Sequence, residues 1–115
     1  MELIEIPGPS YREEKVAEYI EGFLKREIEK TGYEYARVYS DEIHNVYVEF
    51  KGNGDSWFMV TAHTDTVFPD MEGICAKVEN GRLYGLGAKD NRVNVCALLY
   101  TAKELFEKQI RPEYN

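Results

Sequence analysis

The chain has 115 residues, of which 43% are hydrophobic and 30% charged, so it suits one small globular domain and excludes a disordered or fibrous protein. Its 21 acidic residues outnumber 14 basic ones, and the net charge of -7 repels phosphate backbones, so we expect no nucleic-acid partner. No apolar run approaches the roughly 20 residues that cross a bilayer, and the N-terminal residues are acidic where a secretory signal is basic. We therefore expect a cytoplasmic protein with no membrane partner.

The first predicted element is an amphipathic helix that begins after Pro9. Ser10 and Glu13 have the spacing of a capping box, in which each side chain accepts a hydrogen bond from a free amide at the helix start. Apolar side chains then recur at helical spacing until Gly32, which ends the run. Because the remaining face is charged, we expect this helix to lie on the surface of the domain.

Three segments with strand-like composition follow, at residues 33–40, 45–50 and 56–63. Between the last two, Gly52, Asn53 and Gly54 accept positive φ angles, so the pattern predicts that residues 45–50 and 56–63 form a hairpin. The apolar start of residues 56–63 predicts that this strand is buried. The alternating tyrosines of these segments are interpreted as sheet packing; examples are Tyr33, Tyr35, Tyr39 and Tyr47.

Residues 73–87 predict a second, smaller hairpin with Asn80 and Gly81 at its turn. Residues 91–110 then carry apolar side chains around most of a helix, which indicates a helix buried against a sheet and ended by Pro112. The order of helix, strands, hairpin and helix predicts an α/β sandwich.

Several other residues that could carry chemistry are interpreted as structural. Cys75 and Cys96 lack a C-x-x-C spacing and fall in a predicted strand and a predicted buried helix, so we expect two reduced core thiols. His44 precedes a strand at a turn and is expected to lie in a solvated loop.

His63 and Asp65 are the first candidate site residues. Two positions apart at the end of a strand, they would point to the same side, where ligands gather in open α/β sheets. An imidazole there can bind a divalent metal through one nitrogen while a carboxylate holds the other N–H. The pair alone is a weak signal. Asp90, at the start of the last helix, either caps that helix or, because Asn91 could cap instead, is free to bridge two metal ions.

These motifs resemble a known family in the stretches "IPGPSYREEKVAEYI", "HNVYVEFKG", "AHTDTVFP" and "NGRLYGLGAKDN". The chain is similar to the N-terminal part of the dizinc exopeptidases and deacylases, which include peptidase T, acetylornithine deacetylase, succinyl-diaminopimelate desuccinylase and aminoacylase. The resemblance implies a partial α/β/α sandwich with a mixed sheet. It also implies that His63 binds one zinc, that Asp65 is the catalytic aspartate orienting it, and that Asp90 bridges two zinc ions, with cobalt or manganese as possible substitutes. Val93 and Asn94 depart from the family pattern, since many members have glycine there.

Members of that family also supply an adjacent glutamate pair, as general base and ligand, then further ligands and an inserted lid and dimerisation domain. No adjacent glutamate pair follows Asp90 in this chain. We therefore expect residues 1–115 to be an incomplete catalytic domain, without the lid domain and the C-terminal half, that binds zinc weakly or not at all and is inactive alone. The complete enzyme would cleave peptide or N-acyl amino acid amide bonds.

A second hypothesis comes from a different functional class. The chain would be a non-enzymatic module left by a truncated gene, and it would self-associate through an unpaired sheet edge. A homo-oligomer is therefore an expected assembly.

Overall fold

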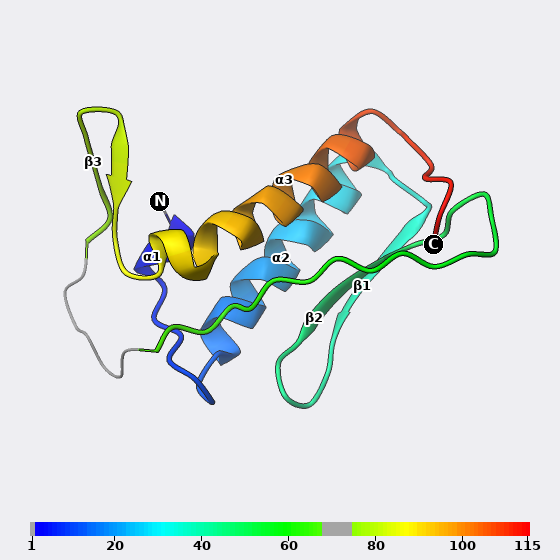
Figure 1. Ribbon diagram of the computed structural model, residues 1–115. Helices are drawn as coiled ribbons and strands as arrows, with labels where there is room; N and C mark the ends of the chain where they lie inside the picture. Colours follow the sequence, from blue (N-terminus) through cyan, green and yellow to red (C-terminus); the bar gives the residue numbers. More distant parts are fainter. Residues whose placement is uncertain (1, 68–74) are drawn as a thin grey trace.

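The computed structural model describes residues 2–67 and 75–115 (Figure 1). The chain contains both helices and strands, so the predicted mixture of α and β structure is confirmed. In chain order the elements are α1 (Glu2–Glu5), α2 (Glu14–Thr31), β1 (Ala36–Ser40), β2 (Val46–Phe50), β3 (Lys77–Glu79), β4 (Arg82–Tyr84), the π-helical turn η1 (Ala88–Arg92) and α3 (Val93–Glu107). Among these residues no helix is long and apolar enough to cross a bilayer.

Helix α2 ends as predicted and begins differently. Gly32 has a left-handed φ of 65°, and its amide donates to the Ile28 carbonyl at 2.8 Å. The predicted capping box is wrong, because the helix starts at Glu14 without a side-chain cap. Glu13 accepts instead from the Tyr11 amide at 2.8 Å, and the Ser10 hydroxyl is used elsewhere, as described below.

The first sheet is the antiparallel hairpin of β1 and β2, in which Val38 faces Val48. The rings of Tyr39 and Tyr47 stack across the two strands at 5.0 Å between centroids, and Tyr33 is buried in the core, so the interpretation of the tyrosines as packing residues is confirmed. The predicted pairing of residues 45–50 with 56–63 is wrong.

The glycines of the predicted turn serve a close backbone approach. A side chain at Gly52 would place its Cβ 2.4 Å from the carbonyl oxygen of Tyr114, so only glycine fits there. Beside this contact, the Asn115 amide donates to the Ser56 carbonyl at 2.9 Å and the Phe58 amide donates to the Asn115 carbonyl at 3.0 Å. This alternation around one residue is the pattern of a parallel strand pair.

Apart from this pairing with Asn115, residues 56–63 run extended without forming a strand, and because most of them are exposed, the prediction of a buried strand is wrong. In Figure 1 this segment is the green trace that crosses the molecule. Its apolar side chains are exposed, namely Trp57, Phe58, Met59 and Val60. The radius of gyration of 15.2 Å exceeds the roughly 13 Å of a compact chain this long, which agrees with apolar surface left uncovered.

The second hairpin is confirmed. Strands β3 and β4 are antiparallel, and Asn80 and Gly81 take φ angles of 51° and 73° at the turn. Residues 73 and 74 of the predicted hairpin lie outside the described residues, as do residues 68 and 69 of the "AHTDTVFP" motif. Both sheets in the described residues are two-stranded and antiparallel, so the mixed sheet stays a prediction.

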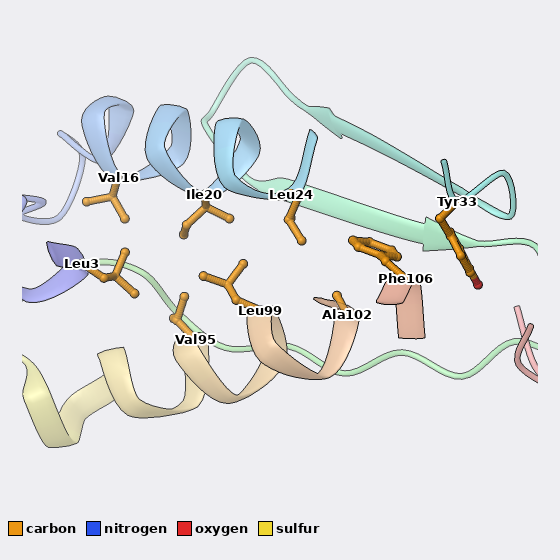
Figure 2. Packing of buried hydrophobic residues seen from close by; sticks show 9 residues of the cluster. All are labelled: Leu3, Val16, Ile20, Leu24, Tyr33, Val95, Leu99, Ala102 and Phe106. Carbon is orange, nitrogen blue, oxygen red and sulfur yellow. The ribbon is translucent and has the colours of Figure 1, made fainter. Parts of the chain in front are cut away.

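The core lies between α2 and α3 (Figure 2). Side chains from the two helices interdigitate along their length, and the hairpin joins at one end through the Phe50 ring, 5.7 Å from that of Phe106. Helix α3 was predicted to pack against a sheet, but its main partner is α2, and the hairpin joins this packing at the end of α3 that carries Phe106. The cluster comprises Leu3, Val16, Ile20, Leu24, Tyr33, Val95, Leu99, Ala102 and Phe106. The helix ends at Glu107, before Pro112.

The cysteine prediction is half correct. Both thiols are free, but Cys75 is exposed and only Cys96 packs against the core. His44 lies in the loop between β1 and β2 with a φ of 65° and a half-exposed side chain, as expected for a loop residue.

Candidate functional site

The structure brings the three predicted site residues together. His63 is the last residue of the extended segment and Asp65 follows it, whereas Asp90 lies in η1, just before α3. Nε2 of His63 is 2.9 Å from Oδ1 of Asp90, and Nδ1 is 3.0 Å from Oδ1 of Asp65. The imidazole therefore lies between two carboxylates, one on each ring nitrogen. The site is open, since the Asp90 side chain is 83% exposed and that of His63 49%.

The loop that carries His63 and Asp65 is fixed against the N-terminal residues. Buried Thr66 donates its amide to the Gly8 carbonyl at 2.8 Å and its hydroxyl to the same oxygen at 3.2 Å. Thr66 also forms a parallel bridge with Pro9. These contacts anchor the loop immediately after Asp65.

Asp90 does not cap α3. Its φ and ψ of -127° and 90° are not helical, and neither η1 nor α3 has a side-chain cap. The Asn91 side chain accepts a hydrogen bond from the Asn94 side chain, and Asp90 uses its carboxylate on His63. Of the two interpretations open for Asp90, capping is therefore wrong, and the metal-bridging role stays a prediction.

The charges in the site favour the ionised forms. Desolvation lowers the pKa of His63, but hydrogen bonds with Asp90 and Asp65 outweigh it and leave that pKa above its usual value. Hydrogen bonding from Ser10 and then from His63 holds the pKa of Asp65 below its usual value. With a carboxylate beside each ring nitrogen, both nitrogens act as donors when the ring is an imidazolium. A metal ion bound at Nε2 would replace the proton on that nitrogen.

Two residues near the site were not found from the sequence. Ser10 donates its hydroxyl to Oδ2 of Asp65 at 2.5 Å, which no local pattern could indicate across 55 positions. Arg92 is 1% exposed, and its Nη2 donates to the Ile6 carbonyl at 3.3 Å. An arginine among polar residues at a helix start gives no periodic sign that its side chain is buried.

The donor set suits a transition metal of the zinc type, because imidazole nitrogen and carboxylate oxygen are common zinc ligands. His63 and Asp90 converge closely enough to share an ion, and Asp65 holds the opposite side of the ring. Within residues 2–67 and 75–115, however, no group of three histidine, cysteine or acidic side chains could hold a metal ion. The described part of the chain thus offers two candidate ligands, where a catalytic zinc normally takes three.

Comparison with known proteins gives a consistent result. Peptidase family M20/M25/M40 matches residues 59–115, which include His63, Asp65 and Asp90. Succinyl-diaminopimelate desuccinylase of Corynebacterium glutamicum is 32% identical over 99 residues, covering 86% of this chain and 25% of that protein. Carboxypeptidase G2 of Pseudomonas sp. is 31% identical over 96 residues, which cover 77% of this chain and 23% of that protein. An uncharacterized metallohydrolase of Methanocaldococcus jannaschii is 25% identical over 111 residues, which cover 91% of this chain and 27% of that protein.

No solved structure matches the chain. The chain spans about a quarter of the length of the curated relatives it matches. These relatives include one of the enzymes named in the sequence-based resemblance, and the family match covers the three candidate site residues. The chain belongs to peptidase family M20/M25/M40.

Proposed function

We propose that this chain forms part of a zinc-dependent hydrolase that cleaves amide bonds in peptides or N-acyl amino acids, and that it carries part of the metal centre. The observation that supports this most directly is the placement of the His63 ring, with Nε2 beside Asp90 and Nδ1 beside Asp65. Family membership and the names of the relatives, a desuccinylase and a carboxypeptidase among them, support the reaction class.

Each residue has a distinct role in this proposal. His63, through Nε2, and Asp90, as the carboxylate shared by two ions, would hold the zinc. Asp65 fixes the ring orientation and tautomer through Nδ1 and increases the basicity of the liganding nitrogen. Bound zinc would acidify a water molecule and polarise the substrate carbonyl. Cobalt or manganese could bind the same donors.

Hydrolysis also requires a third ligand for each ion and a general base that takes the proton of the attacking water. The described residues supply His63 and Asp90 as ligands and no group of three. We therefore propose that residues 1–115 are an incomplete catalytic domain, and that the base, the remaining ligands and the mixed sheet of an α/β/α sandwich come from outside it. The isolated chain would bind zinc weakly and hydrolyse nothing. The cytoplasmic location stays a prediction.

The exposed apolar segment at residues 57–60 supports one alternative for the isolated chain, a self-associating module. The backbone of this segment pairs with the described residues only near Asn115, so a second copy could add a strand along the part that is left unpaired. Sedimentation at micromolar concentration distinguishes the two cases, since a strictly monomeric chain would remove the reason for this alternative.

Calorimetric zinc titration of the chain and of matched variants tests the proposal. We expect His63→Ala and Asp90→Asn to abolish the measurable site, while Asp65→Asn lowers zinc affinity by about 10–100-fold through the loss of ring orientation. His44→Ala is the control, because His44 is the other histidine and the carboxylate beside it is that of Glu14, not that of Asp65 or Asp90. Zinc binding that survives His63→Ala and falls with His44→Ala would contradict the proposal.

A further inference from the structure

We propose that Ser10 is a positioning residue that fixes the Asp65 carboxylate and, through it, the His63 ring. Its consequence for metal affinity rests on the proposed function, whereas its effect on the ring does not. Residues 6–10, which we call the strap, place the Ser10 hydroxyl at this point.

The contact uses both oxygens of one carboxylate. Ser10 Oγ donates to Oδ2 of Asp65 at 2.5 Å, while Oδ1 lies 3.0 Å from Nδ1 of His63. The carboxyl torsion of aspartate has a broad energy profile, so a carboxylate held by one partner alone can rotate. Two partners on different oxygens fix its plane. The imidazole then keeps Nε2 directed at Asp90.

The register of the strap explains why Ser10 reaches Asp65 across 55 positions. The Gly8 carbonyl accepts hydrogen bonds from the Thr66 amide at 2.8 Å and from the Thr66 hydroxyl at 3.2 Å. Pro9 pairs with Thr66 as a parallel bridge. Residue 10 therefore emerges beside residue 65. Both anchoring contacts involve a buried threonine, so the register is held from inside the fold.

The strap also supports the other half of the site. A Cβ at Gly8 would lie 2.6 Å from Val16 Cγ2 and 3.0 Å from Nη2 of Arg92, so the strap lies directly on both side chains. The same Nη2 donates to the Ile6 carbonyl at 3.3 Å. Arg92 is buried and follows Asp90 by two positions. The strap therefore contacts the segment after Asp65, through Thr66, and the segment after Asp90, through Arg92.

Helix capping does not account for Ser10. The sequence pattern assigns it to a capping box, but α2 begins at Glu14 and has no side-chain cap. Glu13, the other member of that box, accepts from the Tyr11 amide. The Ser10 hydroxyl thus donates to Asp65 in the site, although Ser10 lies shortly before the start of α2.

The test compares Ser10→Ala with Ser10→Thr, which keeps the hydroxyl, and with Ser40→Ala. Ser40 is a matched control, because its hydroxyl likewise donates to a carboxylate, that of Glu21 at 2.7 Å, which is not one of the candidate site residues. The first readout is the mobility of the His63 ring in the metal-free chain, from NMR relaxation of its Cε1–H group. The chain has two histidines, so His44→Ala assigns the signals.

We expect Ser10→Ala to increase ring mobility and change the ring nitrogen shifts, Ser10→Thr to restore the wild-type values, and Ser40→Ala to leave them unchanged. In zinc titrations, Ser10→Ala should lower affinity by roughly 3–10-fold, less than the 10–100-fold typical of a group that contacts the ligand directly. Thermal melts check that Ser10→Ala and Ser40→Ala have similar stability.

An unchanged His63 ring in Ser10→Ala overturns the inference, whatever the zinc result. Equal effects of Ser10→Ala and Ser40→Ala also overturn it, since they would reflect general loosening. If the wild-type chain binds no zinc but Ser10→Ala still loosens the ring, the positioning role stands and the proposed function fails.

Discussion

Replacing Phe106 with alanine tests how this chain holds its core. Phe106 is fully buried at the end of α3, and its ring lies 5.1 Å from that of Tyr33 and 5.7 Å from that of Phe50. It is therefore the residue through which α3 contacts both the end of α2 and the β1–β2 hairpin (Figure 2). The substitution removes a whole aromatic ring from a site whose neighbours belong to different elements and cannot all collapse inward.

The expected loss is large compared with the total stability. Burial of phenylalanine and the cavity left behind cost about 3–5 kcal/mol on truncation to alanine. A domain of this length has roughly 6–17 kcal/mol of stability, and the exposed apolar surface at residues 57–60 places this chain near the lower end. Phe106→Ala should therefore remove half or more of the free energy of unfolding. This corresponds to a drop in Tm of about 10–25 °C.

Urea titration followed by circular dichroism measures the change, with Tyr100→Ala as the control. Tyr100 lies on the same helix but is 61% exposed, and its ring contacts that of Phe23 only at 6.4 Å, so we expect a loss below about 1 kcal/mol. If Phe106→Ala costs no more than Tyr100→Ala, the packing of α3 against α2 and the hairpin is not as described.

Three further substitutions test separate features. Gly8→Ala should destabilise the chain by about 1–3 kcal/mol, because its Cβ would lie 2.6 Å from a Val16 methyl group; a thermal melt equal to that of wild type would refute this. Gly32→Ala should lower the free energy of unfolding by about 1 kcal/mol in urea titration, because φ is 65° and an added Cβ would meet nothing within 4 Å, so backbone strain is the sole cost. An unchanged free energy of unfolding would mean that another cap ends the helix. Lys103→Met removes ion pairs of 2.5 and 2.7 Å to two glutamates and should lower Tm at low salt only; the same deficit in 1 M NaCl would assign the effect to packing.

Local patterns predicted the elements whose causes are local. The helical spacing before Gly32 and the left-handed glycine itself fix the end of α2, and Asn80 with Gly81 fixes the turn between β3 and β4. His63, Asp65 and Asp90 were also selected correctly as neighbours. For the helix end and the turn, a short motif contains the residues that determine the geometry, whereas the site brings together two motifs that are 27 positions apart.

The predictions that failed depend on distant partners. Residues 56–63 have strand composition, but a strand also needs a paired neighbour, and the described residues provide pairing only at Asn115. Ser10 has the sequence of a cap, yet the hydrogen bond to Asp65 takes its hydroxyl. Helix α3 is apolar enough for a sheet, but its main packing partner is α2, which lies far from it in the sequence. No periodicity in the sequence encodes these choices.

The most direct test of the metal site is a zinc titration of the chain followed by NMR at the two histidine Cε1–H groups. Binding through Nε2 beside Asp90 predicts that the His63 signal shifts or broadens with added zinc, that His44 stays unchanged, and that Asp90→Asn weakens the response. A response at His44 with an unchanged His63 signal would contradict the assignment of the site.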